Sequence, residues 1–288
     1  MQPGDLITHL DRKAITGMSL REAVHAMRGP PGTKVKVTIG RDGENEPLDF
    51  ELVREVVQVS SIEAKRLDRG VLYVRLKQFQ ETTHEELLKA VAKARKESKE
   101  PILGVLLDMR YNPGGLVDQA ELIADEFLAK GTIYSTRHRG KVLEEVSASP
   151  GGALVEPKIV ILVNEYTASA AELVAGALQD HGRSTVVGNL TFGKGSVQTI
   201  FELPGGSGLR LTTMRYYTPK GRAIQAQGID PDVIIKPAKS STVVRERDLQ
   251  NHLSAETGNG TRPGQTVVQA PEGDALPTLR VADIASDP

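Results

Sequence analysis

A serine that follows an apolar strand is the first candidate for chemistry in this sequence. Ser169 lies where a strand predicted over 159–163 runs through small residues into a helix predicted over 168–179. Free amides and the positive end of the helix dipole favour negative charge there, which is what the oxyanion of an acyl-transfer intermediate carries. The alternative is that Ser169 only caps the helix, because serine is a preferred N-cap residue.

A lysine between two glycines is the candidate base. Lys194 lies in Gly193-Lys194-Gly195, where the glycines leave room for the lysine stem to enter a crowded site. Lysine accepts a proton only when its amine is neutral, and burial among apolar groups disfavours the ammonium form. Gln198 follows four residues later and could orient the amine from the same side of the chain. The alternative is a solvated lysine in a glycine-rich turn.

A glycine-rich loop offers donors for an oxyanion. Residues 108–115 read Asp-Met-Arg-Tyr-Asn-Pro-Gly-Gly and lie between a predicted strand and a predicted helix. No side chain shields a glycine amide, so this loop suits an oxyanion hole. The alternative is an ordinary strand-to-helix turn whose glycines serve only the backbone geometry.

Strands alternate with helices around these three segments. The expected elements are strands over 70–76, 102–107 and 159–163 and helices over 83–97, 116–128 and 168–179. Over 193–217 the pattern changes to strand, glycine-rich turn and strand, which predicts a β-hairpin. The region is therefore expected to fold as an α/β core with an attached hairpin.

The N-terminal residues have the pattern of a smaller module that ends near Glu55. Residues 6–10 have the composition of a strand, and apolar alternation predicts a second strand over 35–39. Ser19 and Glu22 form the capping box of a helix predicted between these strands, over 19–28.

The C-terminal residues have a different composition. Beyond Pro237 the periodicity fades, and Gly, Pro, Ser and Thr become frequent. We therefore expect a tail over 238–288 that is mostly disordered, apart from a short helix over 245–253.

Composition excludes several classes of function. The 36 Lys and Arg residues nearly balance the 37 Asp and Glu residues, so the formal net charge of -1 would not gather nucleic acid or anionic lipid. The chain has no cysteine, and its longest apolar runs fall far short of the ~20 residues of a membrane-spanning helix. Its histidines lack a metal-binding spacing, and His181, the nearest rival base after Ser169, is expected to cap a helix C-terminus.

Several of these stretches occur together in one family. They are 18–24 with 28–33, 107–116, 164–172, 191–198, 216–219 and 228–232, and they include Leu-Asp-Met-Arg-Tyr-Asn-Pro-Gly-Gly-Leu and Thr-Phe-Gly-Lys-Gly-Ser-Val-Gln. With these motifs the chain resembles the C-terminal processing peptidases, also called tail-specific proteases, which are Ser/Lys endopeptidases that carry a PDZ domain.

The resemblance implies a role for each candidate residue. Ser169 would be the nucleophile and Lys194 the general base, and the spacing between them agrees with that of the family. Gln198 would orient the lysine, and the amides of Gly115 and Ala170 would form the oxyanion hole. Glu172 would have a supporting role.

The resemblance also implies a domain organisation. The expected fold is an α/β core of the crotonase-like and ClpP-like kind with an attached hairpin, plus a partial PDZ domain of the α+β class. Residues 2–7 correspond to the middle of the family's PDZ domain, so the chain is expected to be N-terminally truncated. One wall of the peptide groove would remain, made by Leu20, Val24 and Met27. The expected parts are a partial PDZ domain over 1–55, a peptidase core over 56–237 and the tail over 238–288.

The function implied is that of a serine endopeptidase that cleaves polypeptides near or from their C-termini through an acyl-enzyme, without a metal or organic cofactor. Substrates would have apolar C-termini. The resemblance also makes an adaptor protein and a homo-oligomer possible partners. The expected location is the bacterial cell envelope, either periplasmic or membrane-associated.

Two alternatives come from other classes of protein. One is a catalytically inactive, PDZ-type peptide-binding scaffold. The other is an acyl-thioester hydratase or isomerase of the crotonase type, which also uses glycine-rich oxyanion loops but has no use for a neutral lysine beside a serine.

Overall fold

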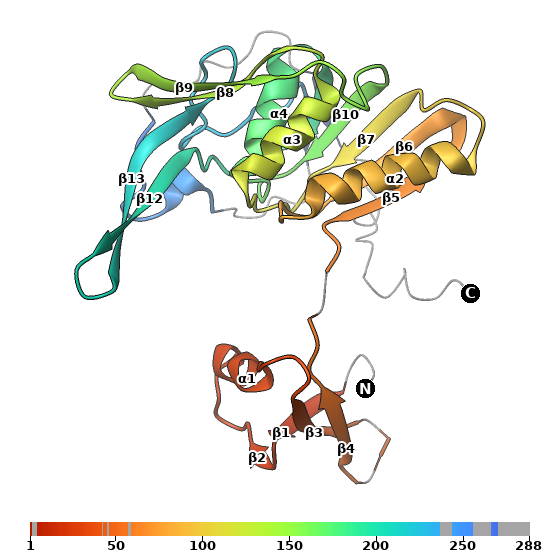
Figure 1. Ribbon diagram of the computed structural model, residues 1–288, viewed down its shortest axis with the longest axis vertical. Coiled ribbons are helices and arrows are strands. Elements are labelled where there is room, and N and C mark those ends of the chain that lie inside the picture. Colours follow the sequence, from red (N-terminus) through yellow and green to blue (C-terminus); the bar gives the residue numbers. More distant parts are fainter. Residues whose placement is uncertain are drawn as a thin grey trace. The chain divides into compact units, whose positions relative to one another are not determined.

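The computed structural model describes residues 1, 5–41, 43–44, 46–56, 59–236, 244–255 and 266–269. Contacts within the chain divide it into two units, Met1–Val59 and Ser60–Pro288. Figure 1 colours both along the sequence, the first in red to orange and the second from orange to blue.

The N-terminal unit contains a small antiparallel sheet. Its strands are β1 (Leu6–Leu10), β2 (Lys13–Ala14), β3 (Lys34–Gly40) and β4 (Leu48–Val53), in the order β2-β1-β3-β4. Alternate residues of β3 point inward and form an aliphatic core with β1, made of Leu10, Val35, Val37 and Ile39. The strands predicted over 6–10 and 35–39 are confirmed.

Within the described residues of this unit there is one helix, α1 (Leu20–Met27), and it begins at the predicted capping box. The Ser19 amide donates to Glu22 Oε2 (2.7 Å), and the Glu22 amide donates to Ser19 Oγ (3.3 Å). No residue of α1 is buried. Leu20 is 82% exposed, Val24 is half-buried, and Met27 packs against the aliphatic core.

The C-terminal unit is built on a seven-stranded sheet in the order β15-β14-β11-β10-β7-β6-β5. The strands are β5 (Ile62–Arg66), β6 (Val71–Leu76), β7 (Gly104–Asp108), β10 (Lys158–Val163), β11 (Ser184–Gly188), β14 (Val233–Lys236) and β15 (Thr266–Gln269). All neighbours are parallel except β5 and β6. A one-turn 3-10 helix, η1 (Asp68–Gly70), joins that antiparallel pair.

Helices α2 (Thr83–Glu97), α3 (Val117–Phe127) and α4 (Ala170–Asp180) share one hydrophobic core with this sheet. Helix α3 contacts both α2 and α4, and α2 crosses in front of β5 and β6 in Figure 1. All residues of α4 are buried. Its small residues let neighbours come close, since a Cβ on Gly176 would lie 2.7 Å from Thr218 Cγ2. The predicted α/β core is confirmed.

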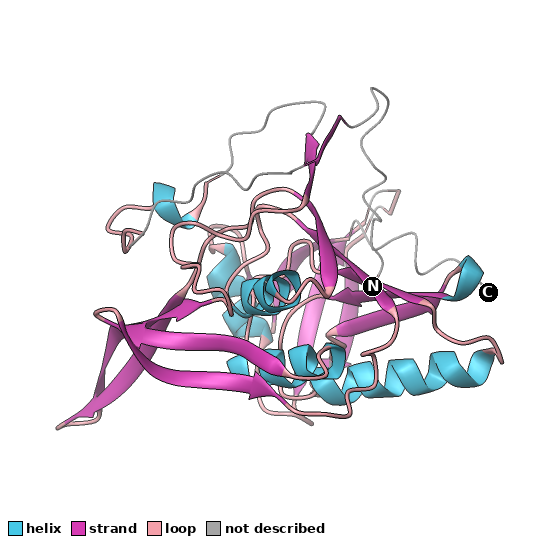
Figure 2. Ribbon diagram, turned by 90° about the horizontal axis from the view of Figure 1, so that it is seen from above, coloured by secondary structure: helices cyan, strands magenta, loops and turns pink. Residues whose placement is uncertain are grey.

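A second, antiparallel sheet has the order β12-β13-β8-β9. Its strands are β8 (Gly131–His138), β9 (Lys141–Ala148), β12 (Ser196–Leu203) and β13 (Ser207–Tyr217), and it lies on the left of the unit in Figures 1 and 2. Strands β12 and β13 are the hairpin predicted over 193–217. The other hairpin, β8 and β9, was not predicted, because β9 is almost wholly exposed and its polar sequence lacks an apolar alternation.

The C-terminal residues differ from the expectation of an unpacked tail. Strand β15 pairs with β14, and the Glu246 amide donates to the Phe192 carbonyl (3.2 Å). The helix expected over 245–253 is a single 3-10 turn, η2 (Glu246–Asp248). The structure differs because these contacts are long-range, so local composition does not reveal them. The parts of the expected tail over 238–243, 256–265 and 270–288 lie outside the described residues.

The helices of the described residues can also be compared with the thickness of a membrane. None of them combines the length and the apolar composition needed to cross one.

Candidate active site

Two loops meet at the carboxyl ends of the neighbouring parallel strands β7 and β10. The Ala168 amide donates to the Asn112 carbonyl (2.9 Å), and Thr167 Oγ1 donates to the Met109 carbonyl (2.9 Å). Ligand sites of parallel α/β sheets form at this end of the strands. The fold therefore brings together the predicted oxyanion loop (residues 109–116, after β7) and the predicted nucleophile loop (residues 164–169, after β10).

Asn112 shapes the first of these loops and is completely buried. Its Nδ2 donates to the Leu76 carbonyl (2.9 Å), and its Oδ1 accepts from the Gly114 amide (2.9 Å). Gly114 and Gly115 follow with φ of +98° and +141°, which L side chains rarely adopt.

Gly114 is in direct contact with the nucleophile loop. A Cβ placed on Gly114 would lie 2.7 Å from Ser169 Cβ, 2.8 Å from the Ala168 carbonyl oxygen and 3.0 Å from the Ala170 amide nitrogen. A Cβ on Gly115 would lie 2.1 Å from the Phe79 carbonyl oxygen. The two glycines therefore permit a close approach of backbones as well as a positive φ.

Gly114→Ala is expected to lower the chemical reactivity of Ser169 by about tenfold to a hundredfold, because a methyl group there would displace Ser169 from its place beside the loop. Gly151→Ala is the matched control, since Gly151 has a similar φ of +109° but nothing within 4 Å of its Cβ position. The rate at which a fluorophosphonate, a reagent for activated serines, labels Ser169 provides the measurement for both variants. Equal losses of this rate in the two variants would attribute the effect to the positive φ alone and contradict the contact argument.

Ser169 is the N-cap residue of α4 and is half-buried. Its φ is +57°, a conformation that costs a non-glycine residue about 1–3 kcal/mol and that recurs at functional sites. Its carbonyl accepts from the amides of Glu172 (2.8 Å) and Leu173 (3.2 Å). The serine is thus held at the start of a buried helix, as the sequence predicts.

The amides of Gly115 and Ala170 are available as donors. Among the hydrogen bonds of the described residues, neither amide donates to an acceptor. Ala170 is the first residue of α4, where amides have no acceptor within the helix. Gly114 lies close to the Ala170 amide, so the glycine loop and the start of α4 meet beside Ser169.

Glu172 links the predicted nucleophile loop to the loop that carries Lys194 (residues 189–195, the lysine loop) from a fully buried position. Its Oε2 accepts from the amides of Ser169 (2.8 Å) and Lys194 (2.9 Å). Its Oε1 accepts from Thr191 Oγ1 (2.5 Å) and from the Gly193 amide (2.7 Å). Burial raises the pKa of Glu172 to about 7, although these hydrogen bonds lower it.

This pKa predicts a pH-dependent effect of Glu172→Gln. Between pH 4.5 and about 7 the folded protein retains a proton on Glu172 that the unfolded chain releases, so this contribution to stability is lost as the pH rises through that window. Glutamine carries no such proton. The free energy of unfolding of the wild type, relative to the variant, should therefore fall by about 3 kcal/mol across the window.

Urea unfolding at a series of pH values measures this difference. Glu85→Gln is the control, because the Glu85 side chain is 64% exposed on α2. A gap between wild type and Glu172→Gln that stays constant with pH would contradict the prediction.

The structure does not bury Lys194, contrary to the sequence-based expectation. Lys194 is exposed, and among the described residues its amine has no hydrogen bond or ion pair, including with Ser169. The flanking glycines serve the backbone instead. A Cβ on Gly195 would lie 2.4 Å from the Gln225 amide nitrogen, and the Gly195 amide donates to Gln225 Oε1 (3.1 Å). The main chain of Lys194 lies near that of Ser169, because both amides donate to Glu172 Oε2, while the lysine side chain is exposed.

Gln198 lies on β12, is exposed, and is not hydrogen-bonded to Lys194 among the described residues. A register shift between Val197 and Gln198 interrupts the alternation of the strand. For this reason the four-residue spacing between Lys194 and Gln198 does not by itself place their side chains on the same side.

Sequence reasoning missed two side chains that hold the lysine loop. Thr191 is fully buried and, besides donating to Glu172, accepts from the Ile229 amide (2.7 Å). Gln225, also fully buried, donates to Glu246 Oε1 (3.1 Å). Both side chains bind residues that are distant in sequence. The local sequence offered one signal, which is that Thr191 is a polar residue directly before Phe192 and Gly193.

Asp108 and Arg110 form an ion pair at the start of the predicted oxyanion loop. Arg110 Nη2 lies 2.6 Å from Asp108 Oδ2, which also accepts from the Tyr73 hydroxyl (2.9 Å). Burial would raise the pKa of Asp108, but the hydrogen bonds and the charge of Arg110 outweigh it and lower the pKa. Asp108 is therefore a paired carboxylate.

His181 is the C-cap residue of α4, as predicted. Its Nε2 is 2.7 Å from the Thr132 carbonyl oxygen. At about 1.5 Å of rise per residue, the helix separates it from Ser169 by roughly 18 Å. His181 is thus too far away to act as the base.

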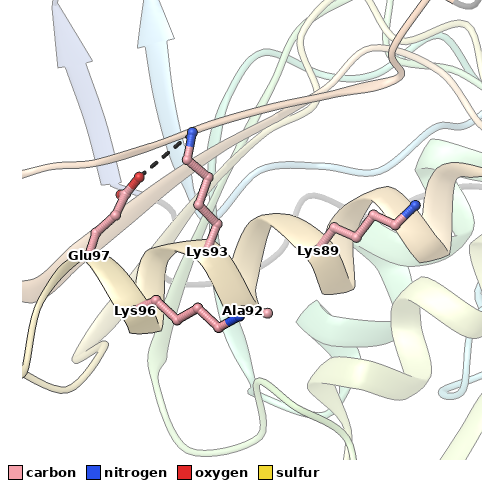
Figure 3. Close-up of a pocket in the computed structure, with 5 residues that line it drawn as sticks. All are labelled: Lys89, Ala92, Lys93, Lys96 and Glu97. Atoms are coloured by element: carbon pink, nitrogen blue, oxygen red, sulfur yellow. Dashed lines mark ion pairs between the residues drawn. The ribbon is translucent and has the colours of Figure 1, made fainter.

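A hollow on the surface of α2 holds none of the candidate site residues. Figure 3 shows its lining, which comes from this one helix and consists of Lys89, Ala92, Lys93, Lys96 and Glu97. The dashed line marks the Lys93–Glu97 ion pair at 3.7 Å. Exposed pairs of this kind, four residues apart, support a helix by a few tenths of a kcal/mol.

The parallel sheet, the buried helix α4 and the loops that meet beside them define an enzyme-like α/β core. A model of one family, peptidase family S41, matches residues 70–235. The chain belongs to peptidase family S41.

Similar proteins bear processing protease names. The chain is 42% identical over 281 residues to the carboxy-terminal-processing protease of Bartonella bacilliformis, covering 94% of this chain and 64% of that protein. It is 38% identical over 240 residues to the carboxyl-terminal-processing protease of Synechocystis, covering 82% and 55%. Among solved structures, the photosystem II D1 C-terminal processing protease matches with a TM-score of 0.58 and 30% identity, covering 83% of this chain and 64% of that one.

These matches have one feature in common. The chain spans less than two thirds of the length of each of these three proteins.

Proposed function

We propose that this protein is a serine endopeptidase that cleaves polypeptides near or from their C-termini through a Ser/Lys dyad. The observation that carries the proposal is the contact of Gly114 with both Ser169 and the Ala170 amide. This contact places a serine, a helix N-terminus and a glycine loop at one point, as acyl transfer requires. The names of the similar proteins support the same reaction.

The proposed chemistry begins at the Ser169 hydroxyl. The neutral amine of Lys194 takes the hydroxyl proton while Ser169 Oγ forms a bond to the carbonyl carbon of the scissile peptide. The amides of Gly115 and Ala170 donate to the resulting oxyanion. As the carbon–nitrogen bond breaks, the protonated lysine gives its proton to the leaving amine. Water then attacks the ester carbonyl carbon while the neutral amine of Lys194 takes a proton from it. As the bond between that carbon and Ser169 Oγ breaks, Lys194 returns the proton to Ser169 Oγ, and the free serine is restored.

A change of side-chain conformation at Lys194 is part of this proposal. Glu172 Oε2 holds the amides of Ser169 and Lys194 together, so rotation of the lysine side chain can bring its amine toward the serine without moving the loop. A bound peptide would cover the amine and exclude water, which favours the neutral form. Gln198 is proposed to orient the amine in that state.

The test is cleavage of a synthetic peptide with apolar C-terminal residues, followed by mass spectrometry. A fluorophosphonate, which reacts with activated serines, should also label Ser169 in the wild-type protein. Cleavage products and an adduct on Ser169 are expected. No cleavage above that of Ser169→Ala, together with no adduct, would overturn the proposal.

The exposed side chain of Lys194 favours a second candidate function, a catalytically inactive peptide-binding scaffold. A scaffold should bind the same peptide without cleaving it and should not react with the fluorophosphonate. The crotonase-type alternative has no comparable support, because the chain belongs to a peptidase family.

The finer structural assignments are also proposals. We propose that the N-terminal unit is a partial PDZ domain whose groove includes Leu20, Val24 and Met27, and that the core is crotonase-like. We propose domain limits of 1–55, 56–237 and 238–288, and a location in the bacterial envelope. An adaptor protein and a homo-oligomer stay predictions from the resemblance.

A further inference from the structure

Two tyrosine rings stack on the surface formed by the two loops of the candidate site. Tyr111 lies in the loop after β7 and Tyr166 in the loop after β10, and their centroids are 5.3 Å apart with an interplanar angle of 14°. Tyr111 is 59% exposed and Tyr166 is 50% exposed. The stack therefore offers a large aromatic area to a further group.

One buried side chain anchors the main chain of both tyrosines. Asn164 Oδ1 accepts from the amides of Tyr111 (2.9 Å) and Tyr166 (3.2 Å), and Asn164 is only 8% exposed. Tyr111 has a φ of +62°, a strained conformation for a bulky residue. The surrounding contacts therefore hold the pair in place before any ligand binds.

The stack bridges the two loops that carry the proposed chemistry. Tyr111 is three residues before Gly114, and Tyr166 is three residues before Ser169. The hydrogen bond from the Ala168 amide to the Asn112 carbonyl joins the same loops between these points (2.9 Å). A peptide that reaches Ser169 thus approaches a surface to which both rings belong.

We propose that the Tyr111–Tyr166 stack determines specificity by binding an apolar or aromatic side chain of the peptide substrate next to the scissile bond. The inference rests on the proposed function. Aromatic faces favour apolar and planar groups. The site would therefore disfavour acidic residues at the same position.

The test compares four peptides that differ only at the two residues flanking the scissile bond. In each peptide both of these residues are the same, either Phe, Leu, Ala or Asp. Wild-type protein should prefer Phe and Leu. Tyr166→Ala should lower kcat/KM for the Phe and Leu peptides by about three- to tenfold, mainly through KM, and leave the other two within twofold. Tyr166→Phe should retain the wild-type preference, because stacking does not need the hydroxyl.

Leu103→Ala is the matched control, because Leu103 is 62% exposed and precedes β7, at the opposite end of that strand from the site. It should leave the preference unchanged. If Tyr166→Ala lowers the cleavage of all four peptides equally, or leaves the preference intact, the inference is overturned.

Peptide binding separates failure of this inference from failure of the proposed function. If the wild type cleaves none of the peptides, the endopeptidase proposal fails, and fluorescence anisotropy with Ser169→Ala still measures their affinities. Tighter binding of the Phe peptide than of the Asp peptide, lost in the Ser169→Ala, Tyr166→Ala double variant, would support the inference. Equal affinities for the two peptides would overturn it.

Discussion

Ser169→Ala is expected to reduce peptide cleavage by at least about a thousandfold, because it removes the oxygen that forms the acyl-enzyme. The amides of Gly115 and Ala170 stay in place in this variant, since they belong to the backbone. Any residual rate would then come from binding and from the oxyanion hole alone. The positive φ at position 169 is no harder for alanine than for serine, so we expect the fold to persist.

The measurement is kcat/KM on the peptide with apolar C-terminal residues, together with circular dichroism to verify folding. Ser147→Ala is the control, since Ser147 is an exposed residue of β9. Cleavage by Ser169→Ala within tenfold of wild type would exclude Ser169 as the nucleophile.

Lys194→Ala is expected to cause a loss of similar size, about a thousandfold or more, because no other proton acceptor would serve the serine. Lys194→Arg should be equally inactive, although it keeps the positive charge, since a guanidinium does not deprotonate in proteins. The Lys194 side chain is exposed, so both variants should unfold within about 0.5 kcal/mol of wild type. A loss of activity would therefore report on chemistry.

Cleavage and the rate of fluorophosphonate labelling of Ser169 are the two measurements, with Lys130→Ala as the control at another exposed lysine. Both rates should fall together in the Lys194 variants. Activity within about threefold of wild type would exclude Lys194 as the base and leave the mechanism without the dyad.

The elements around the site were largely predictable, because they depend on local patterns. The helix predicted over 83–97 coincides with α2, and that predicted over 168–179 differs from α4 (Ala170–Asp180) by only a residue or two at each end. Apolar runs bounded by turn residues identified β7 and β10 in the same way. Eight strands within the described residues were not predicted, because their pairing depends on partners elsewhere in the chain: β2, β4, β5, β8, β9, β11, β14 and β15.

The candidate site was predictable as a set of residues and less so as a geometry. The sequence pointed to Ser169 and to the glycine loop, but not to Gly114 as the residue that touches the serine. It predicted a buried Lys194, whereas the fold uses the neighbouring glycines for backbone contacts and leaves the lysine exposed.

The sequence by itself determined the α/β class, the alternation of β6, β7 and β10 with α2, α3 and α4, and the place of Ser169 at a helix start. These follow from periodicity and capping, which act over a few residues. Only the tertiary structure decided that one buried carboxylate, Glu172, holds the main chains of Ser169 and Lys194, and that Tyr111 stacks on Tyr166. Contacts of this kind join residues far apart in the chain, and they form only when parallel strands bring the ends of separate loops together.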